Sequence, residues 1–207
     1  MGSPLTTTRR SLHGIAELLL AGPQYRSSGT VRLQVTSGGF GQVAGPLRVQ
    51  GADLVWEDDH HPLAGTIRDL AVWAGVEPGA PDGLYSDGSD VDLDETLGVD
   101  PSEADVLQGW FALGDAALRV LGDAADVGEP VLWPEHFDLA VTVDRVNYGV
   151  SPGDASLPEP YAYVGPWDRR ESEFWNAPFG AFRTAVELPD VEALADFFRT
   201  GQAAARA

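Results

Sequence analysis

His136 and Asp138 form the pair in this sequence whose types and spacing come closest to a chemical site. One residue separates them at the start of a stretch in which apolar and polar residues alternate. Side chains two residues apart on a β-strand point to the same face of the sheet. An imidazole and a carboxylate on one face could begin a facial metal triad, or exchange protons as an acid–base pair. Glu159 is a second carboxylate that could complete the acid–base pair.

A purely structural interpretation of the same pair is favoured. The oxygenases that use a facial triad have a second His downstream, and no His follows His136 in this chain. His136 could instead bond a loop carbonyl while Asp138 pairs with an Arg, and short motifs often match by chance. The sequence therefore predicts no bound metal and no other cofactor.

Two further stretches contain metal-ligand residue types. The stretch 57–61 reads Glu-Asp-Asp-His-His, but neighbouring His side chains in an extended segment point apart, so a solvated turn is expected. The stretch 90–94 resembles the first half of a calcium loop. Glu95 stands where that loop needs Gly, and Pro101 stands where it needs a bidentate Glu. We expect a disordered acidic loop there, with weak cation binding as the alternative.

Several aromatic residues follow the His/Asp pair and could line a pocket, although rings are more often part of a core. The predicted ligand-binding residues are Tyr148, Asp154, Tyr161, Tyr163, Trp167 and Trp175. Carboxylates around such a cleft would suit a small molecule, in particular a cationic or amphipathic one.

The elements that would position this site can be read from the alternation. Residues 137–144 predict a strand whose apolar side chains face the core and whose polar side chains, with His136, face the other way. Pro152 and Gly153 predict a turn. A second strand is expected over 161–164. We expect it to pair beside the first, which would place Tyr161 or Tyr163 near His136.

The rest of the chain predicts helices and short strands. A first helix carries Leu12 to Leu20 and ends at Gly22 and Pro23, with His13 and Glu17 one turn apart. Further strands are expected at 30–36, 47–50, 54–57 and 181–188, with a turn at 37–39 and a polar loop at 57–62. Further helices are expected from Thr66 to Gly75, from Asp100 to about Leu121 and from Asp190 onward. Thr66 and Asp69 are spaced as in a capping box, and Val106 is expected to be buried. The predicted fold is α+β, with antiparallel β-sheets in two sub-lobes packed with three to four helices. We expect a single domain over 1–207, with an acidic loop at about 77–100.

Composition limits the partners. The formal net charge is −19, and all 13 basic residues are Arg. A surface this acidic repels nucleic acid and anionic membranes, and no apolar run approaches the length of a membrane span. The chain has no Cys, which excludes disulfides and thiolate metal sites. We expect a bacterial, cytoplasmic monomer or homodimer that binds neither nucleic acid nor membrane.

Five segments resemble an uncharacterised bacterial family, a domain of unknown function. They are Leu12-His13, Gly29–Leu33, Phe137–Thr142 (FDLAVT), Pro158–Tyr163 (PEPYAY) and the final stretch Asp190–Arg199. They occur in the same order as in that family, and the stretch from Gly79 to Asp100 has no counterpart. The resemblance implies one fold over both halves of the chain and implies no activity.

Two functions follow from these residues. The first is a non-enzymatic small-ligand-binding or accessory protein with an aromatic and acidic cleft. The alternative is an enzyme, a hydrolase or a metal-dependent one, that uses His136 with Asp138 or Glu159. Enzymes of this size usually show more than one strong local motif, and no nucleotide-binding or nucleophile motif is present. Binding is therefore the favoured interpretation.

Overall fold

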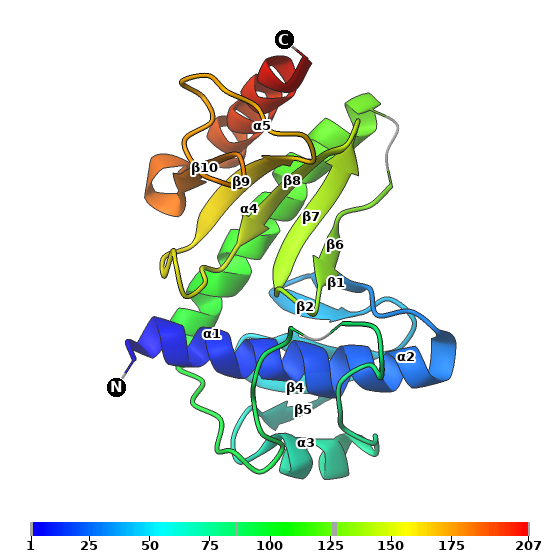
Figure 1. The fold of residues 1–207 in the computed structure, drawn as a ribbon. Helices are drawn as coiled ribbons and strands as arrows, with labels where there is room; N and C mark the ends of the chain where they lie inside the picture. Colours follow the sequence, from blue (N-terminus) through cyan, green and yellow to red (C-terminus); the bar gives the residue numbers. More distant parts are fainter. Residues whose placement is uncertain (1, 86, 126–127, 207) are drawn as a thin grey trace. The chain divides into compact units, whose positions relative to one another are not determined.

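The computed structural model describes residues 2–85, 87–125 and 128–206 (Figure 1). The chain forms two compact units. The first comprises Met1–Gly109 with Leu132–Phe137, and the second comprises Trp110–Val131 with Asp138–Ala207. Strands in both units pair in the antiparallel sense, and helices accompany them. The predicted α+β class with antiparallel pairing is confirmed.

The strands of the first unit form a meander. In chain order they are β1 (Leu33–Thr36), β2 (Gly39–Gln42), β3 (Leu47–Gln50), β4 (Asp53–Trp56) and β5 (Asp59–Pro62), and β6 (Val131–Trp133) pairs with β1. One face of this meander is fully buried at Leu33, Phe40, Leu47, Val49 and Leu54. β2 and β5 lie in segments that the sequence predicted as a turn and a polar loop. They form because each continues a hairpin already started by its neighbour.

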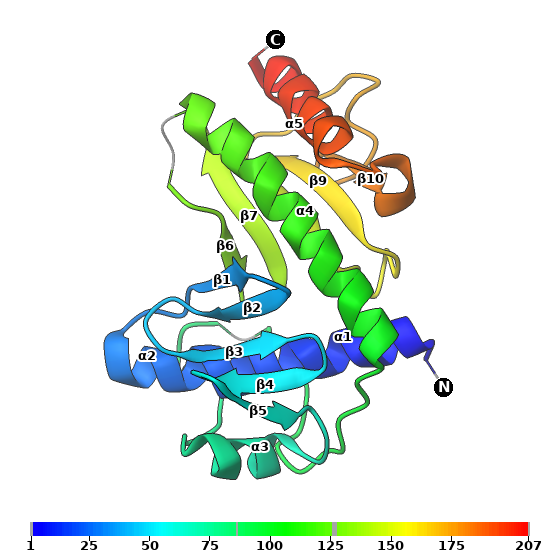
Figure 2. The ribbon, with the colours of Figure 1, turned by 180° about the vertical axis from the view of Figure 1, so that it is seen from behind.

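The first helical segment is one continuous rod that lies across the meander (Figures 1 and 2). It consists of α1 (Pro4–Gly14), a π-helix η1 (Ile15–Ala21) and α2 (Gly22–Ser28). The prediction that it ends at Gly22 and Pro23 is wrong. Gly22 donates its N–H to Glu17, five residues back, and Pro23 then stands in the first turn of α2, where a missing N–H costs little. The rod ends at Gly29, whose φ is 77°.

The wider turn of η1 leaves carbonyls that bond outside the helix. The Leu18 carbonyl accepts from the Gly79 N–H at 2.8 Å, and the Leu20 carbonyl accepts from Gln42 Nε2 at 2.9 Å. All seven residues of η1 are buried, so unsatisfied carbonyls would be costly there. The π-helix is thus supported by groups from two other parts of the first unit.

Helix α3 (Ile67–Ala74) begins at a capping box of Thr66 and Asp69, as predicted, and ends at Gly75. In the described residues of the acidic segment that follows, 76–85 and 87–100, no helix or strand forms before α4. Its described residues are nevertheless held in place. Gly98 donates its N–H to Ser11 Oγ at 2.9 Å, and Leu97 donates to the Gly65 carbonyl at 2.8 Å. For these residues the expectation of a disordered loop is wrong.

Arginines neutralise part of this segment. Arg68 bonds Asp94 through Nε at 2.7 Å, and Arg10 pairs with Glu95 and also donates to the Asp90 carbonyl. The arginines belong to the helices that flank the segment, whereas the sequence shows them only as distant residues. Local composition therefore overstated the repulsion within the segment.

The second unit packs two helices on one face of four strands (Figures 1 and 2). The strands are β7 (Asp138–Val143), β8 (Val146–Ser151), β9 (Tyr161–Pro166) and β10 (Ala181–Thr184), in that spatial order. The helices are the later part of α4 (Pro101–Ala125) and α5 (Val191–Arg206). Gly114 of α4 contacts Val150, and Gly201 of α5 contacts Val164, so small helix residues allow close approach to the sheet.

Three predictions for this part of the chain need correction. β8 lies between β7 and β9, so the strand that carries Tyr161 does not pair with the strand that carries Asp138. Asp144 and Arg145, both at positive φ, form the tight turn that returns the chain as β8. The predicted strand 181–188 becomes a 3₁₀ turn, η2 (Ala185–Glu187), after β10. In α4, which extends to Ala125, Val106 is exposed although it was predicted to be buried.

Candidate functional site

The residues His136 and Asp138 do not share a strand face. Phe137 between them has a φ of 53°, which interrupts the alternation, and β7 begins only at Asp138. His136 lies in the preceding turn with 62% of its side chain exposed, and its Nε2 is 3.2 Å from Glu135 Oε1. The expectation that both residues face the same side of one strand is wrong, because Phe137 turns its ring into the core of the first unit.

Asp138 is instead joined to Tyr163. The Tyr163 hydroxyl donates to Asp138 Oδ2. The Tyr163 ring crosses β8 at Gly149, where an added Cβ would lie only 2.6 Å from the ring. Burial and the charge of Asp138 raise the pKa of Tyr163.

A second tyrosine–carboxylate pair lies next to the first. The Tyr161 hydroxyl donates to Asp154 Oδ2 at 2.7 Å, and the two tyrosine rings are 6.3 Å apart. Asp154 also accepts from the backbone N–H groups of Ser156 and Leu157, which fixes the turn before β9. Burial and the bond to Asp154 raise the pKa of Tyr161. Of the residues predicted to bind a ligand, Asp154, Tyr161 and Tyr163 thus lie close together.

The other predicted residues are not part of that group. Tyr148 packs edge-on against Phe198 in the core beneath α5, and burial raises its pKa to about 12. Trp167 is 60% exposed, with the Arg145 guanidinium 5.3 Å from its ring centre. The remaining two lie on irregular segments. Trp175 contacts the Phe174 ring edge-on at 4.9 Å, and Glu159 is exposed between β8 and β9.

The neighbouring histidines point apart, as expected from the sequence, although they lie on strand β5 and not in a turn. His60 Nδ1 is 3.4 Å from Asp53 Oδ2, whereas the His61 ring lies 5.1 Å from the Trp73 ring. Across the part of the chain that the structure describes, no group of three His, Cys, Asp or Glu residues could hold a metal ion.

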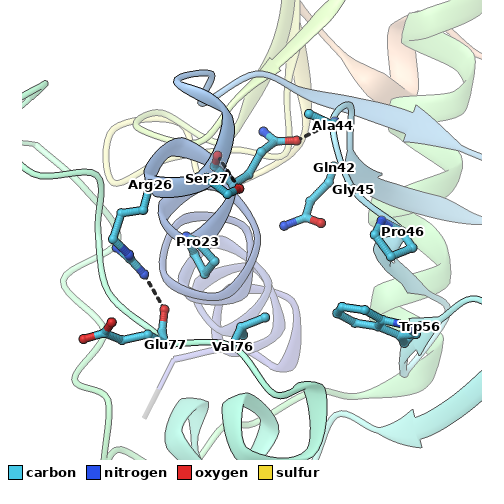
Figure 3. Close-up of a pocket in the computed structure, with 11 residues that line it drawn as sticks. Pro23, Arg26, Ser27, Gln42, Ala44, Gly45, Pro46, Trp56, Val76 and Glu77 are labelled. Carbon is cyan, nitrogen blue, oxygen red and sulfur yellow. Dashed lines mark hydrogen bonds between the residues drawn. The ribbon is translucent and has the colours of Figure 1, made fainter.

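The first unit contains an open pocket of about 410 Å³ at the C-terminal end of the helical rod (Figure 3). Its walls come from α2, from the segment between β2 and β3, from β4 and from the segment after α3. The lining residues are Pro23, Gln24, Arg26, Ser27, Gln42, Ala44, Gly45, Pro46, Trp56, Val76 and Glu77. This volume lies in the range of small-molecule sites.

Two buried glutamines fix the walls. Gln24 donates to the carbonyls of Thr30 and Arg32 at 3.1 and 2.8 Å, and its oxygen accepts from the Ala44 N–H at 2.8 Å. Gln42 bonds the Leu20 carbonyl of η1, as described above. Because both amides bond backbone on separate segments, the pocket is preformed and not dependent on side-chain rearrangement.

Arg26 and Trp56 stand at opposite ends of the pocket, with Pro23 and Val76 between them (Figure 3). The Arg26 guanidinium donates to the Gly79 carbonyl at 3.4 Å and to the Glu77 carbonyl. Both carbonyls belong to the acidic segment. The pocket therefore combines an apolar middle with one oriented cation.

Buried polar residues earlier on the helical rod hold the acidic segment against it. Glu17 Oε2 accepts from the Ser89 N–H at 2.8 Å and from Ser89 Oγ at 2.7 Å. The Tyr85 hydroxyl is buried and lies close enough to Glu17 to be affected by its charge. Burial, together with the charges of Glu17 and Glu135, raises the pKa of Tyr85.

His13 belongs to the same helical rod. Its Nε2–H donates to the Pro134 carbonyl at 2.8 Å, and its ring stacks on Phe137 at 5.4 Å with an interplanar angle of 7°. Burial lowers the pKa of His13, so the ring is neutral at pH 7. Both His13 and Glu17 thus fix other segments on the rod.

Sequence reasoning did not find the residues of the pocket. Arg26, Gln42 and Trp56 come from separate short elements, and none belongs to a recognisable motif. One signal was present: Glu17 interrupts an apolar run just before Gly22 and Pro23. A carboxylate inside a buried helix requires donors from elsewhere, which points to a segment folded over the helix.

Comparisons with models of known protein families, with curated protein sequences and with solved structures found no match. In the described part of the chain, every helix is too short or too polar to cross a membrane.

Proposed function

We propose that this protein is a non-enzymatic binding protein for a small amphipathic molecule, and that the ligand occupies the pocket between α2 and Trp56. The observation that carries the proposal is the preformed pocket of about 410 Å³, whose lining is mostly apolar and includes a few polar side chains. Sites for small molecules in proteins share these features.

The middle of the pocket suits a flat apolar group. Trp56 offers an aromatic ring, and Pro23 and Val76 offer rigid apolar surface. An aromatic group gains from stacking as well as from leaving water. Because the walls are preformed, little of this gain is lost in ordering the protein.

The lining residues favour binding over catalysis. They include no His, and Ser27, the hydroxyl residue among them, donates its Oγ–H to the Gln24 carbonyl at 3.0 Å. A hydroxyl nucleophile needs a base beside it, and this one is used in a helix hydrogen bond. The amide groups of Gln24 and Gln42 are likewise used in backbone bonds.

Native mass spectrometry of gently purified protein tests the proposal, followed by titration of the released molecule into ligand-free protein. Trp56→Ala should lose the bound molecule. Trp167→Ala should keep it, since Trp167 is an exposed tryptophan of the second unit and does not line the pocket. A ligand that remains bound at full occupancy in Trp56→Ala would contradict this assignment of the site.

A further inference from the structure

The pocket contains a cation whose charge is not neutralised by a carboxylate. At least seven arginines of the described chain lie within ion-pair distance of an acid, and Arg26 is not among them. Its partners are the backbone carbonyls of Glu77 and Gly79. Carbonyls orient the guanidinium but carry no net charge to cancel it. The guanidinium therefore presents its positive charge at the pocket, in a chain whose net charge is −19.

The guanidinium also keeps donors for a ligand. Arginine has five N–H groups. Two nitrogens of Arg26 each donate to one carbonyl, which leaves Nε–H and one hydrogen on each terminal nitrogen. Because the carbonyls already hold the side chain, a ligand would not have to order it, and the entropic cost of binding is reduced.

Glu77 does not supply the missing charge. It is the acidic residue among those that line the pocket, but its carboxylate points away from the side on which Trp56 lies (Figure 3). It is the Glu77 backbone carbonyl, not the carboxylate, that contacts Arg26. The positive charge of Arg26 is thus the dominant one presented to a molecule in the pocket.

We propose that the ligand is an organic carboxylate with an aromatic ring, bound with the carboxylate on Arg26 and the ring against Trp56. This inference rests on the proposed function. The guanidinium fork matches a carboxylate in shape, and such pairs form two parallel hydrogen bonds. A single arginine suits a singly charged anion, because the acidic surface opposes more highly charged ligands such as phosphate esters. Pro23 and Val76 separate the two ends, so the charge and the ring are joined by a short linker.

Three shape-matched probes test the charge preference: 2-naphthylacetate, 2-naphthylacetamide and 2-(2-naphthyl)ethylammonium. Isothermal titration at pH 7 should show that the carboxylate binds about tenfold more tightly than the amide, a difference of about 1.4 kcal/mol. The ammonium probe should bind most weakly. Trp56→Ala should weaken all three probes alike.

Arg26→Gln should remove the preference for the carboxylate and leave binding of the amide within about twofold. Arg26→Lys, which keeps the charge but not the fork, should retain part of the preference. Arg32→Gln is the matched control, since it removes the same charge from an exposed arginine that does not line the pocket. Thermal unfolding of each variant checks that the bonds lost to Glu77 and Gly79 have not unfolded the unit.

The outcomes separate the two proposals. If the carboxylate and amide bind equally, if the ammonium binds best, or if the preference survives in Arg26→Gln, the inference about the ligand is wrong while the binding function stands. If none of the probes binds at millimolar concentration, or if Trp56→Ala leaves their affinity unchanged, the proposed function itself is contradicted.

Discussion

The Tyr163 hydroxyl donates to Asp138 from two strands away, across the backbone of β8. This contact is possible because Gly149, the residue in between, has no side chain to block the ring. A glycine in a strand normally weakens the sheet, and an aromatic ring from a neighbouring strand can cover the gap. The pair therefore ties three strands of the second unit together.

Tyr163→Phe should destabilise the second unit by about 1.5–3 kcal/mol, since it removes a hydrogen bond to a charged group and leaves the carboxylate partly buried. Urea unfolding followed by circular dichroism measures the change. Tyr25→Phe is the control, because Tyr25 lies on α2 of the first unit and is only partly buried. Equal stability of the Tyr163 variant and the wild type would show that the bond contributes nothing.

Four of the five tyrosines should resist ionisation. The pKa of Tyr148 is about 12, and burial also raises the pKa values of Tyr85, Tyr161 and Tyr163. A raised pKa in the folded state stabilises the fold below the ordinary value near 10, and that stabilisation is lost as pH rises further. Absorbance at 295 nm during alkaline titration should therefore rise mainly together with unfolding. A smooth titration of these four tyrosines near pH 10 in folded protein would contradict the burial of their rings.

His13 should make the fold sensitive to mild acid. Burial lowers its pKa below the ordinary value of 6.5. Just below pH 6.5 the unfolded chain therefore binds a proton at His13 that the folded chain does not bind. Its contribution to stability is present above pH 6.5 and is lost as pH falls through the lowered folded pKa. Unfolding free energies of wild type and His13→Gln should converge toward low pH. Free energies that differ by the same amount at every pH would contradict this role of His13.

Gly22→Ala should be strongly destabilising, by about 1–3 kcal/mol, because its Cβ would overlap the Gly79 carbonyl oxygen. Gly109→Ala is the matched control in another helix. No atom lies within 4 Å of a Cβ built there, so higher helix propensity should stabilise the protein by about 0.8–1 kcal/mol. Thermal melting compares the two variants, and similar effects of both would show that the contact at Gly22 is not tight.

The acidic segment should show protected amides in hydrogen exchange. Gly79, Ser89 and Leu97 each donate a backbone hydrogen bond to another part of the first unit. Glu17→Ala removes the acceptor of Ser89, so exchange at Ser89 should accelerate while Leu97, bonded to Gly65, stays slow. Fast exchange at all three amides in the wild type would support the original expectation of disorder.

Local patterns predicted those parts of the fold that depend on near neighbours. The caps at Thr66 and Asp190 and the apolar alternation of β7 are confirmed, because capping and burial depend on residues close in sequence. Phe137 shows the limit of this approach. Its residue type fits a strand, but its backbone is at positive φ and its ring packs against Phe40 in the core of the first unit.

The pocket could not be predicted because its residues are positioned by contacts with residues far away in the sequence. Gln42 is positioned by a carbonyl of η1, and Arg26 by carbonyls of the acidic segment. Neither partner is identifiable from composition or spacing. Gly22 and Pro23 were misread for the same reason, since a break in the α-helical hydrogen-bond pattern is tolerated only where other groups bond the freed carbonyls.

The π-helix η1 also sets the rotational phase of the helical rod. A turn closed five residues back contains one residue more than an α-helical turn, so winding the same residues as a regular α-helix would rotate α1 against α2 by about 100°. Such a helix would keep every residue and remain continuous. It would nevertheless turn His13 away from Pro134, or else Gln24 away from Ala44. A change in the hydrogen-bond pattern alone would thus separate two attachments that now coexist on one rod.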